Sequence, residues 1–198
     1  ILHAVDGVSL EIAENEILGL VGESGSGKST FGKALIGLHQ RTSGEAYFNN
    51  TLLPERFSAS DHLHYSKLMQ MIFQDPYSSL NPRMTILDII GEGLAIQGNL
   101  SKADIKEQVS YWLRRVGLHS DHMSRYPHEF SGGQRQRIGI ARAMIIGPKF
   151  VVCDEPISAL DVSVQAQVVN LLEELKQTLG LTLLFIAHDL SMVRYVSD

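Results

Sequence analysis

The sequence predicts an α/β protein in which helices flank a mainly parallel sheet and a helical subdomain is inserted. Short apolar runs with the length of buried strands alternate with segments whose apolar residues recur at helical spacing. Between residues 75 and 143 the strand-like runs stop and helical spacing prevails. We therefore expect a discontinuous α/β core in residues 1–74 and 144–198, and a helical subdomain in residues 75–143.

The first part of the core predicts a strand, a glycine-rich turn and a helix. Residues 17–21 are an apolar run with the length of a buried strand. A helix is expected over Ser29–Leu38, where Gly37 and the polar residues after it bring the helix to an end. Residues 47–48 then predict a strand that runs into a turn at residues 49–50.

The inserted part begins with a loop marked by Pro76 and Pro82, and helical spacing follows over Ile86–Ile96 and Ala103–Val116. The residues 150–153 and 182–186 are expected to be two further buried strands. The segment between these strands ends at Gly180, where a helix C-cap glycine belongs. Its apolar residues form one face of an amphipathic helix: Val164, Val168, Leu171, Leu172, Leu175 and Leu179.

The composition is that of an ordinary globular domain, with 44% hydrophobic and 20% charged residues among 198. The formal net charge of −5 argues against a broad nucleic-acid-binding surface, because such a surface needs a basic stripe. No apolar run approaches the roughly 20 residues of a membrane-spanning helix, and no secretory signal is visible. Any role at a membrane is therefore expected to work through a partner. The single cysteine, Cys153, excludes an intrachain disulfide and is expected to be an inert buried thiol.

The loop between the first strand and the first helix carries a phosphate-binding pattern. It fits G-x-x-x-x-G-K-[ST] without mismatch, in the strand-then-helix context that the pattern requires. Glycines let backbone N–H groups close around a polyphosphate, and the following helix offers its positive end. We predict that the lysine reaches the β- and γ-phosphates and that the next hydroxyl ligates Mg²⁺. The residues expected at the nucleotide are Gly22, Ser24, Gly25, Ser26, Gly27, Lys28, Ser29 and Thr30.

Two carboxylates, Asp154 and Glu155, directly follow an apolar strand. Ligands of open α/β sheets bind beyond the carboxyl ends of the strands, so both residues are expected beside the phosphate-binding loop. We predict that Asp154 holds Mg²⁺ through water and that Glu155 polarises the water that attacks the γ-phosphorus. Taken alone, the same two residues also fit an ordinary acidic loop.

A third motif gives the sequence a family resemblance. Residues 130–136 (Phe-Ser-Gly-Gly-Gln-Arg-Gln) resemble the signature motif of ABC ATPases, whose usual first residue is leucine. Gln74 matches that family's Q-loop glutamine, residues 158–161 match its D-loop, and His188 matches its switch histidine. The order and spacing of these motifs over essentially the whole chain carry the resemblance. Taken singly, each motif also fits an ordinary surface residue, turn or helix cap.

A narrower resemblance is to the ATPase subunits of bacterial oligopeptide and dipeptide importers, and residues 71–85 and 126–130 carry it. It implies an ATP-binding and ATP-hydrolysing subunit that energises peptide import through transmembrane permease subunits. It also implies a second ATP-binding subunit, identical or related, and a peripheral position at the cytoplasmic face of the inner membrane. Residues 74–85 would be the contact surface for the permease.

The family resemblance also implies a P-loop NTPase core whose helical subdomain carries the signature, and it assigns roles to single residues. Two ATP-binding subunits would form a head-to-tail sandwich with Mg-ATP at each seam. The catalytic residues of one subunit would be Lys28, Gln74, Glu155 and His188, and its metal ligands would be Ser29, Gln74 and Asp154. The residues that reach the nucleotide through the signature and the D-loop would be Ser131, Gly132, Gly133, Gln134 and Asp161.

The sequence departs from this family in three places. The aromatic residue that stacks on adenine would stand before Ile1, and the family continues with further strands beyond His188. We therefore expect a core truncated at both ends, with unpaired sheet edges and weaker ATP binding than a longer chain. Equal affinities in a titration of the two chains would contradict this expectation. Asn15 stands where a turn glycine is common.

Two other functions fit parts of the pattern. A soluble ABC ATPase that acts on nucleic acid or ribosomes shares these motifs, but such proteins commonly separate them with a long coiled coil or basic insertions. The interval between Lys28 and Ser131 is too short for a coiled coil of that kind, and the net charge is negative, so no nucleic-acid partner is expected. A catalytically silent ATP-binding module is the other alternative, against which Glu155 and His188 argue. The histidine pairs 62/64 and 119/122 lack further ligands and are expected to be surface residues.

Overall fold

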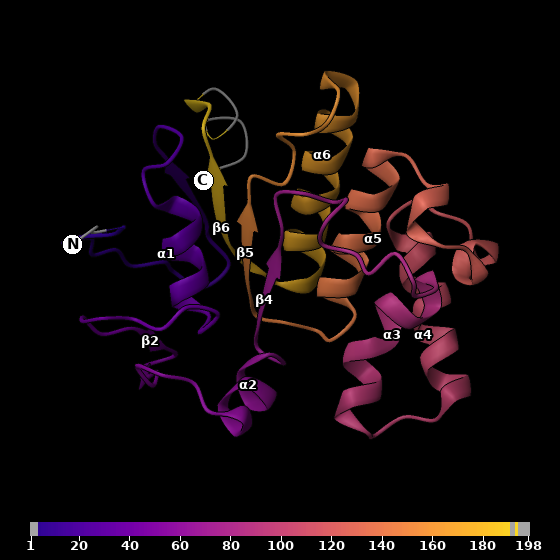
Figure 1. Cartoon of the computed structure of the whole chain (residues 1–198), viewed down its shortest axis with the longest axis horizontal. Coiled ribbons are helices and arrows are strands. Elements are labelled where there is room, and N and C mark those ends of the chain that lie inside the picture. Colours follow the sequence, from indigo (N-terminus) through magenta and orange to yellow (C-terminus); the bar gives the residue numbers. More distant parts are fainter. Residues whose placement is uncertain (1–3, 191–192, 194–198) are drawn as a thin grey trace.

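The computed structural model describes residues 4–190 and 193, in which helices lie on both faces of a parallel sheet (Figure 1). Within these residues the sheet has four strands in the order β1-β6-β5-β4, and each neighbouring pair is parallel. The elements in chain order are β1 (Ile17–Val21), α1 (Lys28–Leu35), β2 (Tyr47–Phe48), β3 (Thr51–Leu52), α2 (Ala59–Tyr65), β4 (Met69–Ile72), α3 (Ile86–Gln97), α4 (Lys102–Arg115), η1 (Ser120–Ser124), η2 (Pro127–Glu129), α5 (Gly132–Met144), β5 (Phe150–Asp154), α6 (Val162–Leu179) and β6 (Thr182–Ala187).

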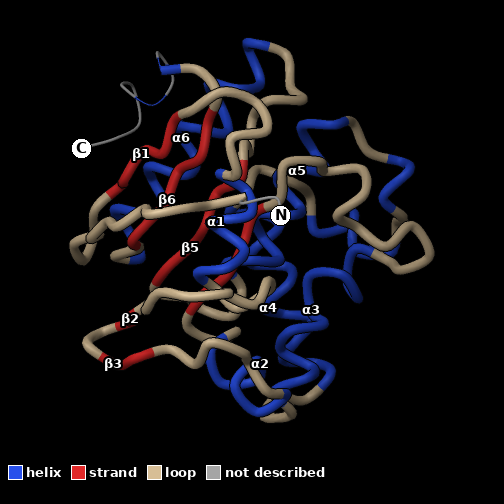
Figure 2. Tube along the Cα trace, turned by 60° about the vertical axis from the view of Figure 1, so that its left-hand side comes forward, coloured by secondary structure: helices blue, strands red, loops and turns tan. Residues whose placement is uncertain are grey.

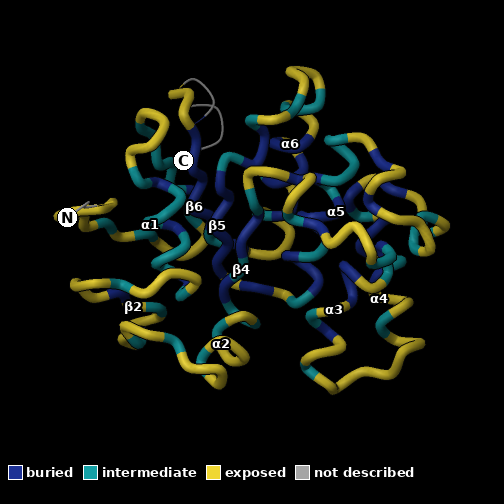
Figure 3. The backbone as a smooth tube through the Cα atoms, in the orientation of Figure 1, coloured by how far each residue is buried: buried dark blue, intermediate teal, exposed yellow. Residues whose placement is uncertain are grey.

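Side-chain alternation along the strands divides the apolar core between the two faces of the sheet. Val152 and Ile186 belong to the cluster that includes the end of α1, whereas Cys153 and Phe185 belong to the cluster formed with α3, α4, α5 and α6. Helix α1 therefore covers one face, and α5 and α6 cover the other (Figure 2). Both faces are covered, and the central strands β5 and β6 are buried almost along their whole length (Figure 3), whereas the edge strand β1 is partly exposed after Ile17.

All four strands run the same way, so their carboxyl ends meet at one edge of the sheet (Figure 1). The segments that leave this edge begin at Gly22 after β1, Phe73 after β4, Glu155 after β5 and His188 after β6. Ligands of parallel sheets bind at such an edge. The topology thus gathers the phosphate-binding loop, Gln74, the carboxylates and the histidine from distant parts of the sequence.

The helices of the inserted part begin at hydroxyl residues that cap them. Thr85, Ser101 and Ser131 precede α3, α4 and α5, and each side chain accepts a hydrogen bond from the backbone N–H three residues later. This capping satisfies N–H groups that have no partner within the helix. The short hairpin β2–β3 turns at Asn49 and Asn50, which adopt φ of 47° and 60°, as a two-residue hairpin turn requires.

The α/β class is confirmed, as are the strands over residues 17–21, 150–153 and 182–186. The helix before Gly180 is also confirmed, and this glycine caps it with a left-handed φ of 64°. The helix expected over Ser29–Leu38 ends earlier, at Leu35, because Gly37 takes φ 78° and the chain turns back. Strand β4 and helix α2 were not predicted. In the part of the chain that the structure describes, no helix has both the length and the hydropathy of a membrane span.

Candidate functional site

The loop between β1 and α1 has a backbone shape that glycine makes possible. Gly25 and Gly27 adopt φ of 80° and 90°, in the left-handed region. A Cβ on Gly27 would also lie 2.0 Å from the carbonyl oxygen of Ala4, so no larger residue fits there. Among the described residues, no side chain caps the first turn of α1, which begins at Lys28. The positive end of the helix is therefore left to an anion.

Lys28 is folded back into this loop. Its Nζ donates hydrogen bonds to the carbonyl oxygens of Gly22 at 2.7 Å and Glu23 at 2.8 Å, and the residue is 8% exposed. These carbonyls compensate a buried ammonium only in part, because neither of them carries a full negative charge. A polyphosphate in the loop would offer Lys28 a charged partner in their place.

Ser29 and Asp154 bring a hydroxyl and a carboxylate together at the start of α1. Ser29 Oγ donates to Asp154 Oδ1 at 2.6 Å, although the two residues are 125 positions apart. Asp154 is 3% exposed, and its burial raises the pKa of the carboxyl, opposed by the Ser29 hydrogen bond and by the charges of Lys33 and Lys28. Hydroxyl and carboxylate oxygens are the ligands that Mg²⁺ prefers, so this pair fits the predicted metal.

Glu155 is held between Gln74 and His188. Gln74 Nε2 donates to Glu155 Oε2 at 2.9 Å, and His188 Nδ1 lies 3.6 Å from the same oxygen. The structure therefore brings together three residues that are far apart in the sequence. The side chain of Glu155 is 13% exposed, whereas that of His188 is 60% exposed. This cluster leaves one carboxylate oxygen for another donor, such as a water molecule.

The backbone of Glu155 is strained. Its φ of 43° lies in the left-handed region, which a glutamate adopts only when the surroundings enforce it. Glu155 N donates to Ile186 O at 3.0 Å, and the Ser158 hydroxyl donates to the carbonyl of Glu155 at 3.1 Å. These bonds fix the turn that aims the carboxylate at the edge of the sheet. Backbone strain of this kind is typical of functional residues.

The signature residues lie elsewhere, at the N-terminus of α5. Ser131 and Gln134 cap this helix reciprocally: Ser131 Oγ accepts from Gln134 N, and Gln134 Oε1 accepts from Ser131 N. A Cβ on Gly133 would lie 2.5 Å from Val164 of α6, and one on Gly132 would lie 3.4 Å from the Tyr77 hydroxyl. Helices α1 and α5 cover opposite faces of the sheet, so the signature does not meet Lys28 within this chain (Figure 1).

Asp161 occupies the N-cap position of α6, but its side chain makes no cap hydrogen bond. Asp161 thus stands where a helix-capping residue stands, but its carboxylate does not cap the helix.

The sequence also predicts the surroundings of residues outside the motifs, namely Cys153 and the histidine pairs. Cys153 is buried, and its burial raises the pKa of the thiol to about 12, so it is inert as expected. His122 is partly buried against Phe130 instead of lying on the surface, and no group of three metal-ligating side chains occurs among the described residues.

Two contributors to the site were not predicted from the sequence. Lys33 lies on α1 and acts on the charge of Asp154, and Tyr77 lies against the first turn of α5. The position of Lys33 one helical turn after Ser29 is a signal that could have identified it. Nothing in the sequence around Tyr77 indicates its contact with α5, because that contact depends on how a loop crosses the helix.

The sequence profile of the ABC transporter family matches residues 5–158. The chain is 59% identical over 198 residues to the oligopeptide transport ATP-binding protein OppF of Bacillus subtilis, covering 100% of this chain and 65% of the relative. It is 56% identical over 198 residues to the dipeptide transport ATP-binding protein DppF of Lactococcus lactis, covering 98% of this chain and 63% of the relative. The chain thus spans slightly less than two thirds of the length of these curated relatives.

Solved structures give the same fold. The dimeric post-hydrolysis state of the ATP-binding cassette MJ0796, bound to ADP and Pi, superposes with a TM-score of 0.87 at 29% identity, covering 98% of this chain and 83% of that one. CbiO1 of Clostridium perfringens, part of an ABC transporter complex, superposes with a TM-score of 0.85 at 28% identity, covering 99% of this chain and 76% of that one.

Proposed function

Because this chain belongs to the ABC transporter family, we propose that it binds and hydrolyses ATP as the energising subunit of a peptide importer. The observation that carries the proposal is the contact of Glu155 with Gln74 and His188, one residue beyond the Ser29–Asp154 pair. This arrangement offers a metal site and a base at the end of a phosphate-binding loop. The names of the relatives, which are oligopeptide and dipeptide transport proteins, support the choice of peptide as the transported solute.

In this proposal the chain's own residues bind the nucleotide and orient a water molecule. Lys28 would exchange the carbonyls of Gly22 and Glu23 for the phosphates, and Ser29, Asp154 and Gln74 would hold Mg²⁺. When bound, Mg²⁺ would neutralise charge on the phosphate oxygens. Glu155 accepts a hydrogen bond from the attacking water, and His188 stabilises the charge that develops nearby.

We propose that a second ATP-binding subunit completes each site. Ser131 caps α5, which lies on the opposite side of the sheet from α1, so the first turn of α5 would reach a nucleotide held by the neighbouring subunit (Figure 1). Asp161, whose carboxylate makes no cap bond, would lie at the same seam. The dimeric state of the solved cassette supports this arrangement.

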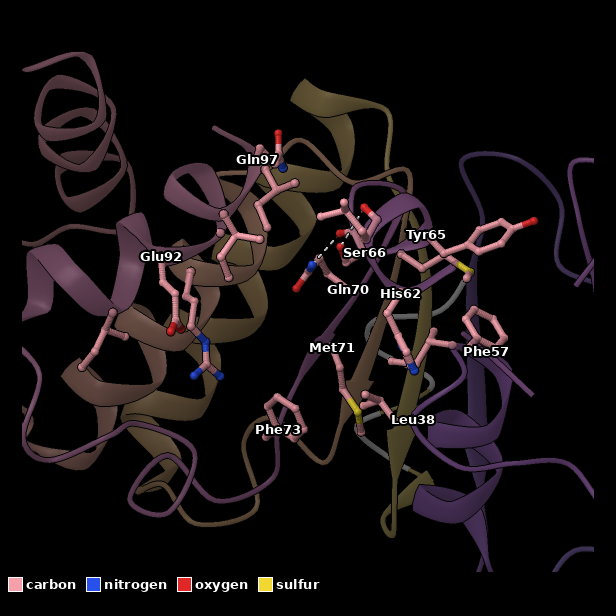
Figure 4. A pocket seen from close by; sticks show the side chains of 18 residues that line it. Leu38, Phe57, His62, Tyr65, Ser66, Gln70, Met71, Phe73, Glu92 and Gln97 are labelled. Atoms are coloured by element: carbon pink, nitrogen blue, oxygen red, sulfur yellow. Dashed lines mark hydrogen bonds between the residues drawn. The ribbon is translucent and has the colours of Figure 1, made fainter. Parts of the chain in front are cut away.

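We further propose that a membrane permease contacts residues 74–85, as the family resemblance implies, and also docks in the groove that Phe73 lines, between α2 and β4 on one side and α3 on the other (Figure 4). The cavity measures about 320 Å³, and Phe57, Met71 and Phe73 line it together with Ile96, which is 65% exposed. Glu92 and Arg142 add charge to a wall that also carries the polar side chains of Ser66, Gln70 and Gln97. The groove lies where the expected core (residues 1–74 and 144–198) meets the expected helical subdomain (residues 75–143). Such a permease contact would hold the chain at the cytoplasmic face of the membrane.

Substitution of Glu155 by Gln tests the catalytic assignment. We expect the rate of ATP hydrolysis by the assembled transporter to fall by at least about 100-fold while nucleotide affinity is retained, because the amide keeps the shape and loses the base. Glu107→Gln, on the exposed face of α4, serves as the matched control with normal turnover. A Glu155→Gln protein with normal turnover would overturn the assignment.

Affinity purification of the full-length protein from detergent-solubilised membranes tests the partners. Recovery of multi-span membrane proteins supports the transporter, and the presence or absence of a second ATPase distinguishes a heterodimer from a homodimer. Recovery of ribosomes or other soluble factors alone would contradict the proposal that a permease is the partner.

A further inference from the structure

The segment that follows β4 is attached to α5 by two arginines. Arg135 and Arg142 are seven positions apart, about two helical turns, so they project from the same face of α5. The guanidinium carbon of Arg135 lies 4.1 Å from the centroid of the Tyr77 ring. Arg142 Nη1 donates to the carbonyl oxygen of Ser79 at 2.6 Å, and its guanidinium lies 5.7 Å from the Phe73 ring. The loop is therefore held against the helix at two points.

Arg135 is fixed on its other side as well. Its Nε donates to the carbonyl oxygen of Pro127 at 2.8 Å, so the guanidinium lies between η2 and the ring of Tyr77. Asp75 also interacts with this part of the loop. A backbone hydrogen bond from Tyr77, a side-chain hydrogen bond from Ser78 and the charge of Arg135 lower the pKa of the Asp75 carboxyl. Asp75 thus fixes the backbone at Tyr77, and Arg135 contacts its ring.

Tyr77 also reaches the signature itself. Its hydroxyl and its ring both lie beside Gly132, where an added Cβ would stand 3.4 Å from the hydroxyl and 3.7 Å from ring carbon Cε2. Three residues earlier in the same segment, Gln74 donates to Glu155. One short loop therefore contacts the candidate catalytic carboxylate at its start and the first turn of the signature helix at Tyr77.

We propose that Tyr77 and Arg135 form a positioning pair that fixes the first turn of α5 relative to Gln74 and Glu155. The inference rests on the proposed function, because it concerns the alignment of two half-sites that only an assembled ATPase brings together. The pair acts through Ser131 and Gln74 and touches no substrate itself. Correct alignment of two preformed groups is a major part of an enzyme's rate, and small displacements reduce it strongly.

Exposure argues that this pair contributes to alignment more than to folding. The side chain of Tyr77 is 56% exposed, so its ring buries little surface. An exposed cation–π contact is weak, and for a chain of this size its loss lowers the melting temperature by no more than about 4 °C. The substitutions below can therefore be compared in folded protein.

The experiment compares Tyr77→Ala, Tyr77→Phe and Tyr111→Ala in the full-length protein assembled with its transporter partners. Tyr111 is 46% exposed on α4, where its ring contacts the neighbouring Trp112, so its substitution is the matched control. We expect Tyr77→Ala to lower kcat about tenfold, with nucleotide affinity and melting temperature close to those of the parent. Tyr77→Phe keeps the ring face over Arg135 and is expected to keep turnover, as is Tyr111→Ala.

A double-mutant cycle separates the pair from a direct permease contact of Tyr77. If the two residues act as one unit, Tyr77→Ala combined with Arg135→Met loses no more turnover than either substitution alone. Additive losses, or equal losses in Tyr77→Phe and Tyr77→Ala, would overturn the pairing. Normal turnover of Tyr77→Ala beside a Glu155→Gln control that has lost turnover would overturn the pairing and leave the proposed function standing. An assembly without ATP hydrolysis in the parent protein would overturn both.

Discussion

Asp154 and Glu155 are neighbours in the chain, but the structure gives them different surroundings. Asp154 ends a buried strand and is 3% exposed, whereas Glu155 lies one residue beyond the strand, with its side chain 13% exposed and in contact with Gln74 and His188. Burial makes the charged form of Asp154 costly, and the Ser29 hydroxyl and nearby lysines compensate it in part. These surroundings fit the roles proposed above, in which Asp154 would hold a cation and Glu155 would accept a hydrogen bond from water.

Asp154→Asn is predicted to stabilise the nucleotide-free protein at neutral pH by about 1 kcal/mol, because it removes a buried charge and keeps an acceptor for Ser29. The raised pKa means that the folded carboxyl takes up a proton at a pH where the unfolded one, near 3.8, is still charged. The parent protein therefore gains stability as the pH falls through the raised pKa, and the difference between the two proteins shrinks.

Thermal unfolding of both proteins between neutral and mildly acidic pH measures this difference. Glu107→Gln removes one negative charge from the surface and controls for net charge. An Asp154→Asn protein that is less stable at neutral pH would mean that the lysines outweigh the burial of the carboxylate.

At the residue scale, the sequence predicts chemistry better than conformation. The phosphate-binding loop follows from its own spacing, and the contact of Ser29 with Asp154 confirms that the acidic strand end lies beside it. The left-handed φ at Glu155 has no sequence signal, because glutamate rarely adopts it. Asn15 and Asn50 also adopt φ values in the left-handed region, which asparagine tolerates.

At the scale of single elements, α1 depends on close approach to the sheet. Gly32 lies on its buried face, where an added Cβ would stand 2.8 Å from Val152 Cγ1 and 3.1 Å from Ile186 Cδ1. These neighbours are branched side chains in the middle of the sheet and have little room to move. This contact sets how closely α1 packs on the sheet, and with it the position of Lys28 and Ser29.

Gly32→Ala is predicted to destabilise the protein by about 1–2 kcal/mol, because overpacking outweighs the gain in helix propensity. Gly139→Ala is the matched control, since Gly139 is also inside a helix but nothing lies within 4 Å of its added Cβ. That control is expected to gain up to about 1 kcal/mol. Denaturant unfolding of both variants measures whether each substitution raises or lowers the free energy of unfolding. A stabilised Gly32→Ala protein would contradict the packing argument.

Elements with a clear period could be predicted, and elements without one could not. The leucine and valine spacing of α6 and its terminal Gly180 predicted that helix to within two residues of its start. Strand β4 contains Met69, Gln70 and Met71, which carry no strand signal, and its place in the sheet depends on pairing with β5. Helix α2 is short and polar and has no buried residue, so it lacks an apolar stripe.

At the scale of the whole molecule, the sheet separates two apolar clusters, one on each of its faces. The strands β5 and β6 lie in the middle of the sheet, and Val152 and Leu184 are 0% exposed. The hairpin β2–β3 lies outside the sheet, with Tyr47 60% and Leu52 53% exposed. Stability is therefore concentrated at the centre.

Amide hydrogen exchange of the nucleotide-free chain is predicted to follow this division. Amides in β5 and β6 are expected to exchange at least about 100-fold more slowly than those of the hairpin, because they open only in global unfolding. Mass-spectrometric or NMR exchange measures the ratio. Equal protection of hairpin and central strands would show that the hairpin is part of the cooperative core.

The α/β class and the inserted helices could be predicted for the whole chain, because buried strands and amphipathic helices leave different periods in the sequence. The strand order β1-β6-β5-β4 could not, since β1 pairs with β6 across most of the chain length. For the same reason, the approach of Gln74 and His188 to Glu155 followed only from the family resemblance.

The left-handed backbone at Glu155 also affects which substitutions of this residue would leave the protein folded. Both glutamate codons become glycine codons by a single base change, and glycine is the residue best suited to φ 43°. Glu155→Gly would relieve this backbone strain, so we expect it to fold and to escape the quality control that removes most damaged proteins. On the proposed function, such a variant would bind nucleotide without turning it over.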